Sequence, residues 1–94
     1  MTPTPAALDL RSRDGGPLRV WDHGGSGPPM LFCHCAGTLA RVWDPVIRRL
    51  EPGWHAYSLD FRGHGDSLKP EGRAAYQWAS FAGDVEDAAR QLAF

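Results

Sequence analysis

Residues 60–67 read DFRGHGDS, with two glycines, an arginine and two aspartates in eight positions. The glycines allow the backbone a tight path. Arg62 can hold the loop through hydrogen bonds to carbonyl groups or to Asp60 or Asp66. The stretch is not a dinucleotide-binding fingerprint, because residues 63–68 lack the third glycine and the next helix lies far along the chain. We therefore expect a structural loop after a strand, in which Arg62 and both aspartates support the backbone.

A second loop, residues 34–38 (HCAGT), follows the apolar run of residues 30–33. A short apolar run bounded by turns predicts a strand buried on both faces, as in a parallel sheet. Backbone N–H groups in a small-residue turn can face a developing negative charge. An ordinary strand-to-helix turn, with Gly37 at positive φ, is the alternative. Both loops are predicted at the carboxyl ends of strands, where open α/β sheets place their ligands.

The flanking pattern predicts an α/β fold. Apolar residues alternate with polar ones at 8–10 and again at 18–20, and the turn sequence DGGP at 14–17 separates them, which predicts an antiparallel hairpin. A further strand is expected over residues 54–59. The element order β-β-β-α-β-α implies parallel strands in its β-α-β-α part, and we expect residues 1–94 to lie in one domain.

Two helices are predicted from apolar residues spaced three and four apart. The first covers residues 39–50 and contains Pro45. We expect Asp44 to be its N-cap and Pro45 its first helical residue, after an earlier turn from Leu39; a single helix kinked at Pro45 is the alternative. Pro52 and Gly53 should end this element. The second helix has the apolar positions Trp78, Phe81, Ala82, Val85, Ala88, Ala89 and Leu92, with Asp84 and Asp87 off that face.

Charge and composition exclude several function classes. The net charge is -1 without a basic face, so we expect no nucleic-acid partner. Apolar runs are much shorter than a membrane span, and the first ten residues do not resemble a secretory signal, so we expect a cytoplasmic protein and no membrane partner. Cys33 and Cys35 are expected to be buried free thiols. We expect no metal or organic cofactor, since His23, His55 and His64 lack zinc-type spacing to the cysteines.

Taken in order, these segments resemble the N-terminal part of the α/β-hydrolase fold family. The pattern Asp60-x-Arg62-Gly63-x-Gly65-x-Ser67 is similar to the loop after the family's fourth strand, and residues 30–37 resemble the strand that ends in its His-Gly oxyanion motif. The resemblance extends from residue 8 to residue 94. It also includes Trp43 and Pro45 in the first helix, and Tyr76, Asp84 and Val85 at the second.

The resemblance implies roles for the two loops. The Ala36 N–H is the expected oxyanion donor, with Cys35 adjacent. The family usually has Gly in place of Cys35, and a Cβ there narrows the conformations of the turn. His34 would hold the loop by its ring hydrogen bonds rather than act as a base, and we expect His64 to be a solvated loop residue. The remaining loop-support residues are Gly37, Asp60, Arg62, Gly63, Gly65 and Ser67.

The family's nucleophile elbow, Gly-x-Ser-x-Gly, is absent from the sequence. Ser26 lacks the closing glycine and Ser67 has only the preceding one. The sequence ends at Phe94, where the family turns into its nucleophile strand, so this chain is expected to hold no catalytic triad and to be inactive alone. Without that strand, residues 30–33 would form an open apolar sheet edge. We expect the isolated chain to be marginally stable, or to need a partner chain or self-association through that edge.

Two functions remain open at this point. The first is an N-terminal fragment of a serine-type hydrolase that acts on ester, amide or related bonds of a small-molecule substrate once completed. The alternative is a non-catalytic truncated domain that acts as a binding or interaction module through its sheet edge. A small nucleotide-binding domain is disfavoured because the chain lacks a complete phosphate-loop motif.

Overall fold

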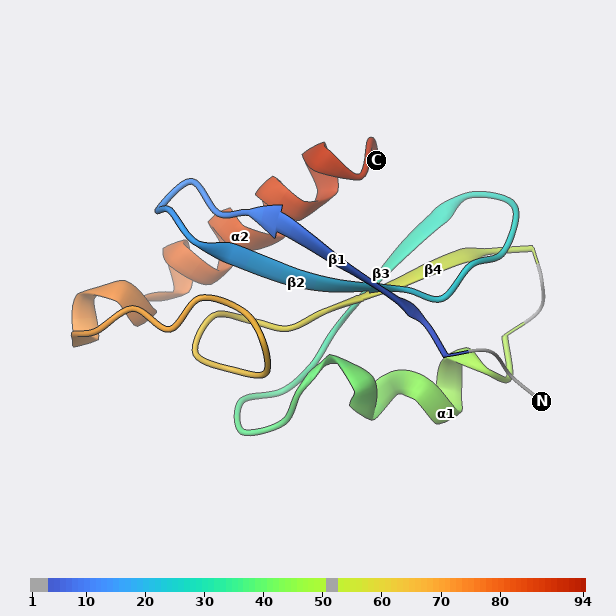
Figure 1. Ribbon diagram of the computed structural model, residues 1–94, viewed down its shortest axis with the longest axis horizontal. Helices are drawn as coiled ribbons and strands as arrows, with labels where there is room; N and C mark the ends of the chain where they lie inside the picture. The colour runs from blue at the N-terminus through green and yellow to red at the C-terminus, as the bar shows by residue number, and fades with distance from the viewer. Residues whose placement is uncertain (1–3, 51–52) are drawn as a thin grey trace.

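A computed structural model describes residues 4–50 and 53–94 (Figure 1). Its elements follow the predicted order, with two short 3₁₀ turns added. The strands are β1 (Ala6–Arg11), β2 (Pro17–Asp22), β3 (Pro29–Cys33) and β4 (His55–Leu59). The helical elements are η1 (Ala40–Trp43), α1 (Asp44–Ile47), η2 (Arg73–Tyr76) and α2 (Trp78–Gln91). None of the helices in this described part is long and apolar enough to cross a membrane.

The strands form one mixed sheet in the order β1-β2-β4-β3. β1 pairs antiparallel with β2, with Leu8 opposite Val20, and β2 pairs antiparallel with β4. β3 pairs with β4 in parallel, with Leu31 opposite Tyr57. The predicted hairpin and the predicted parallel pair are therefore confirmed. β3 lies at the edge of the sheet, and no strand within the described ranges pairs with its other side.

Helices cover both faces of the sheet (Figure 1). Alternate residues of β2 and β4 point to one face, where Leu18, Val20 and Leu59 are fully buried together with Ala88 of α2. The opposite face carries η1 and α1, and there Trp21 of β2 lies beneath the guanidinium of Arg41. Successive side chains of a strand point to opposite faces of the sheet, so the same strands can pack against helices on both faces.

The first helix differs from the prediction at its start. Asp44 has helical dihedrals (φ -50°, ψ -48°), and the N-cap position belongs to Trp43, so the prediction of an Asp44 N-cap is wrong. The turn predicted from Leu39 is present as η1 and runs directly into α1, which leaves no extended residue to act as a cap. The Asp44 carboxylate instead accepts a hydrogen bond from Arg41 Nε at 2.8 Å. The predicted helix end at Pro52 lies outside the described residues.

The buried face of α2 is more polar than predicted. Asp84 and Asp87 are fully buried, whereas Trp78, at the start of the apolar stripe, is 89% exposed. The two carboxylates face the turn between β1 and β2, where Ser12 Oγ donates to Asp84 Oδ1 at 3.0 Å and the Arg13 N–H donates to Asp87 Oδ2 at 2.7 Å. These hydrogen bonds compensate the burial of charge.

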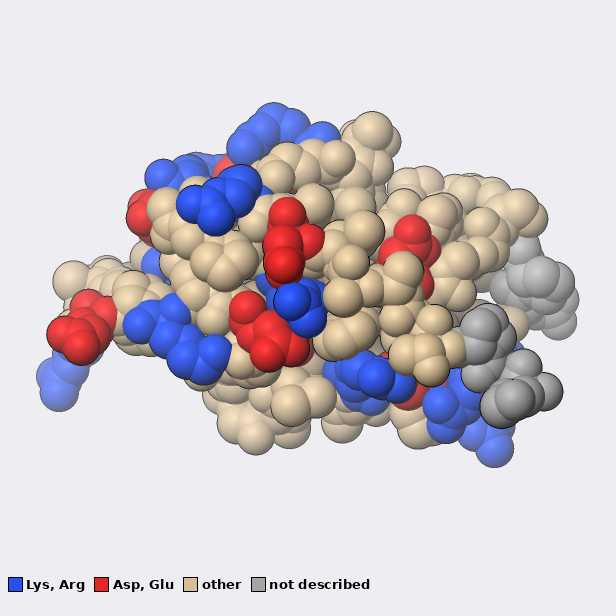
Figure 2. Space-filling model, viewed as in Figure 1, with Lys and Arg blue, Asp and Glu red and all other residues tan. Residues whose placement is uncertain are grey.

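Acidic and basic side chains are interspersed on the face shown in Figure 2, with no extended patch of one sign. Arg19 illustrates the mixing, because it pairs with Asp9 of β1 and with Asp66 of the 60–67 loop. That face lacks the clustered positive charge typical of nucleic-acid binding.

Candidate functional site

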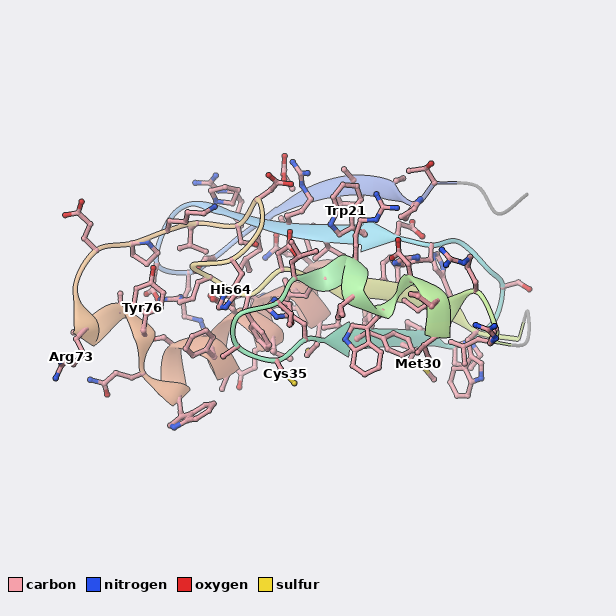
Figure 3. The ribbon with its side chains drawn as sticks, turned by 90° about the horizontal axis from the view of Figure 1, so that it is seen from below. Trp21, Met30, Cys35, His64, Arg73 and Tyr76 are labelled. Atoms are coloured by element: carbon pink, nitrogen blue, oxygen red, sulfur yellow. The ribbon has the colours of Figure 1, made fainter. Side chains whose placement is uncertain are left out.

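The two loops singled out in the sequence lie side by side. β3 and β4 are parallel neighbours, so residues 34–38 and 60–67 leave the sheet at the same end. Figure 3 shows Cys35 and His64 on these neighbouring loops. The rings of His34 and His64 meet edge to face, with their centroids 4.9 Å apart.

His34 joins the first loop to the second. Its buried ring accepts a hydrogen bond at Nε2 from the Phe61 N–H at 3.0 Å. Its Nδ1 lies 2.7 Å from the Cys35 carbonyl oxygen, to which Thr38 Oγ1 also donates. Because a backbone N–H can only donate, these contacts assign the proton to Nδ1 and leave Nε2 as a neutral acceptor.

His64 makes the reverse connection. Its Nε2 accepts from the Gly37 N–H at 3.0 Å, and its Nδ1 lies 3.0 Å from the Arg62 carbonyl oxygen. The expectation of a solvated loop residue is therefore wrong. A spacing argument along the sequence could not find this contact, since the bonded residues are 27 positions apart.

Asp60 fixes the start of the second loop. Its buried carboxylate accepts from the Ala40 N–H at 2.7 Å and from the Asp66 N–H at 3.2 Å. Gly65 has a φ of +50°, and a Cβ there would lie 2.2 Å from Asp60 Oδ2. Gly65 is therefore required for two reasons: its backbone has a positive φ, and a larger side chain would overlap the Asp60 carboxylate.

Ser67 and Gly63 close the same loop. Ser67 Oγ donates to the Asp60 carbonyl oxygen and accepts from the Arg19 N–H at 2.9 Å. The Gly63 N–H donates to the Leu68 carbonyl at 2.8 Å, and a Cβ on Gly63 would lie 2.7 Å from Tyr76 Cε1. The loop is thus held by its own backbone and by β2.

Arg62 is held by α2 rather than by its own loop. Its guanidinium binds Asp84, with Nε 2.6 Å from Oδ2 and Nη2 2.8 Å from Oδ1, and also contacts Asp14 and the Ala75 carbonyl. Of the expected partners, a carbonyl group is present at Ala75, whereas Asp60 and Asp66 are not bound because both are engaged elsewhere. The hydrogen bonds that the guanidinium donates to Asp84, and to a lesser degree to Asp14, raise the pKa of Arg62. The sequence did contain one signal for this pair. Asp84 is an acidic residue within a helix that packs on the sheet, and such a residue needs a basic partner when it is buried.

A cleft of about 380 Å³ opens where the loops meet α2. It is lined by residues 34–36, Phe61, His64, Trp78 and Phe81, none of which is an acid, a lysine or an arginine. The Ala36 N–H faces no hydrogen-bond acceptor among residues 4–50 and 53–94. Such a donor beside an apolar cleft can bind an oxygen that gains negative charge.

A profile of the alpha/beta hydrolase fold matches residues 28–93. The chain belongs to the α/β-hydrolase family. Among its relatives, 2-(acetamidomethylene)succinate hydrolase of Mesorhizobium japonicum is 39% identical over 69 residues, which cover 73% of this chain and 24% of that protein. Fluoroacetate dehalogenase of a Burkholderia species is 34% identical over 74 residues, which cover 76% of this chain and 24% of that protein.

Solved hydrolase structures have the same fold. E-2-(acetamidomethylene)succinate hydrolase superposes with a TM-score of 0.83 at 32% identity, over 95% of this chain and 32% of that one. An epoxide hydrolase from metagenomes of hot environments superposes with a TM-score of 0.86 at 28% identity, over 97% of this chain and 31% of that one. This chain therefore spans about a quarter to a third of the length of these proteins.

The two thiols of the chain, Cys33 and Cys35, lie on either side of His34 in the sequence. Both are free, as predicted, and burial raises the pKa of the half-buried Cys33. Cys35 is exposed, which corrects the prediction that both are buried. Its position after β3, rather than within it, places the side chain at the rim of the cleft. No group of three or more potential ligands in the described part of the chain is arranged to hold a metal ion.

Proposed function

We propose that this chain is the N-terminal portion of a single serine-type hydrolase domain and that it supplies the oxyanion-binding turn. The observation that carries the proposal is the Ala36 N–H: it follows the carboxyl end of β3, has no acceptor in the described residues, and belongs to a residue that lines the apolar cleft. The Cys35 and Gly37 peptides flank this donor, and Gly37 is already bonded to His64.

The chemistry that suits this turn is hydrolysis of an ester, amide or related bond in a small molecule. Attack on a carbonyl carbon places negative charge on the carbonyl oxygen, which a fixed N–H donor stabilises. The nucleophile, its base and the acid would come from outside these residues, with the nucleophile on a Gly-x-Ser-x-Gly elbow. Relatives named as hydrolases of acetamidomethylene succinate support this bond class. A cytoplasmic location remains a prediction.

The test starts with the reading frame downstream of the Phe94 codon. We expect it to continue into a strand and a nucleophile elbow, and we expect a fluorophosphonate probe to label the longer protein but not residues 1–94. In the longer protein, Ala36→Pro removes the N–H and should lower kcat about 10²–10³-fold, whereas Ala36→Gly keeps the donor. A stop codon with no gene that supplies the elbow, or an active A36P variant, overturns the proposal.

The second candidate, a binding module, is favoured by one observation. β3 is an edge strand with half-buried side chains, and a groove of about 260 Å³ lined by Thr38, Val42, Trp43 and Val46 lies beside it. An exposed edge of this kind can accept an additional strand. A stop codon after Phe94, together with a strand-forming peptide that binds and broadens the β3 amide signals, would favour this function over hydrolysis.

A further inference from the structure

The two loops exchange hydrogen bonds through their histidines, and this exchange is the main polar connection of the turn. His34 accepts from the second loop at Phe61, and His64 accepts from the first loop at Gly37. We propose that His64 is a positioning residue for the oxyanion turn and that it acts only as a neutral imidazole. This inference rests on the proposed function of the turn.

The turn needs such a support because little else packs against it. Residues 35–39 are exposed, and Gly37 has a φ of +84° with no atom within 4 Å of the place a Cβ would occupy. Within the turn, the Thr38 N–H donates to the Cys35 carbonyl at 3.2 Å. The bond from the Gly37 N–H to His64 therefore fixes the plane of the Ala36–Gly37 peptide, one peptide after the proposed donor.

His64 is itself anchored through Arg62 to the buried interior of the molecule. Its Nδ1 faces the Arg62 carbonyl oxygen at 3.0 Å, and the Arg62 side chain is held by Asp84 of α2. The orientation of the Ala36–Gly37 peptide is thereby connected, through two side chains, to the longest helix of the chain. Preorganisation of this kind lowers the reorganisation needed when charge develops.

A proton on His64 would remove this support. A protonated Nε2 is a donor and would face the Gly37 N–H, which is also a donor. The neighbouring groups offer no compensation: both nitrogens of the adjoining His34 ring are engaged in other contacts, the cleft walls Trp78 and Phe81 are uncharged, and Asp60 is engaged by the Ala40 and Asp66 N–H groups. Asp66, the other acid of the loop, pairs with Arg19. The turn should therefore loosen in acid.

Nuclear magnetic resonance of the ¹⁵N-labelled 94-residue chain tests the proposal without any catalytic assay. We expect neutral His64 to carry its proton on Nδ1, and we expect the Gly37 amide signal to shift in acid at the same midpoint as the His64 ring. His64→Ala should move the Gly37 amide signal and abolish its acid transition. His55→Gln, which changes a histidine bonded to Asp22 instead, is the matched control and should leave both unchanged.

His64→Gln covers the case in which the alanine variant unfolds. Its amide oxygen can accept the Gly37 N–H but cannot titrate, so a folded H64Q chain with a pH-independent Gly37 amide signal supports the proposal. A proton on Nε2, or a Gly37 amide indifferent to His64, overturns it. Unfolding of both variants also overturns it, because His64 would then maintain the fold as a whole.

In the longer hydrolase, H64A should lower kcat by up to about 10²-fold with KM unchanged, and H64Q should restore most of it. A loss expressed in KM alone contradicts the positioning role. If the amide signals behave as expected but A36P leaves kcat intact, the proposed function fails while the connection between the loops stands.

Discussion

The guanidinium of Arg62 and the carboxylate of Asp84 form a two-pronged ion pair that is closed to solvent. The two bonds measure 2.6 and 2.8 Å, and the side chains are 1% and 0% exposed. The pair joins the 60–67 loop to α2 across 22 positions of sequence. Burial of both charges costs free energy, which their mutual attraction offsets. Removal of one partner therefore leaves a buried charge without compensation and destabilises the fold.

Asp84→Asn should therefore destabilise the chain strongly. We expect the free energy of unfolding to fall by about 3–5 kcal/mol, because the Arg62 charge stays buried without its full counter-charge. A chain of this size can unfold with such a loss. Urea unfolding followed by circular dichroism measures the change. Arg90→Gln, which removes an exposed partner of Asp87, is the control and should cost about 0–1 kcal/mol. Equal losses in both variants would contradict the role of the buried pair.

Gly65→Ala should cost more than its backbone conformation alone explains. The new Cβ would overlap the Asp60 carboxylate, which holds Ala40 and Asp66. Gly15→Ala is a matched control, since Gly15 also has a positive φ (+82°) but nothing lies within 4 Å of its Cβ position. We expect about 1–2 kcal/mol for G15A and a clearly larger loss for G65A in thermal or urea unfolding. Identical losses of unfolding free energy in G15A and G65A would show that the Asp60 carboxylate can move away from the new Cβ without destabilising the fold.

Asp87 should make stability depend on pH in acid. Hydrogen bonds from the Arg13 side chain lower the pKa of Asp87 from 3.8 to about 2, with further contributions from the Arg13 backbone and Arg90. A carboxylate with a lowered folded-state pKa stabilises the protein above the unfolded-state pKa, and this stabilisation is lost as pH falls from about 4 to about 2. Unfolding free energies across that window measure it. Asp87→Asn should flatten the profile there, and Asp66→Asn, whose carboxylate is exposed, should leave its slope intact.

The β3 edge should mediate self-association of the 94-residue chain. Met30 is a half-buried residue of this strand, and its neighbours on the sequence are apolar. A lysine at an open edge opposes pairing with another chain. Met30→Lys should thus lower the average mass in concentrated samples, measured by sedimentation equilibrium. Leu8→Lys, on the other edge strand, is the comparison. Association that persists in M30K and disappears in L8K would assign the contact to β1 instead.

The comparison between sequence and structure is clearest in α2. The apolar spacing predicts the helix correctly, but it assigns Trp78 to the buried face and Asp84 to the exposed one, and the structure reverses both. Helical periodicity predicts the buried face from the hydrophobicity of the helix residues alone. In this structure the buried face also depends on which residues elsewhere in the chain can form hydrogen bonds with the helix. Ser12, Arg13 and Arg62 provide hydrogen bonds that make two buried aspartates acceptable.

The succession of strands and helices along the chain, the antiparallel hairpin, and the two loops at the ends of β3 and β4 could all be predicted from the amino-acid sequence. These features depend on local periods and on glycines that permit positive φ, which short segments encode directly. Three features emerge only from the packing of the folded chain: the bond from the Gly37 N–H to His64, the pairing of Arg62 with Asp84, and the position of Ala36 in the cleft lining. The two hydrogen-bonded pairs are 22 and 27 positions apart in the sequence, and the cleft brings together residues still further apart, so all three features depend on how whole elements pack against one another.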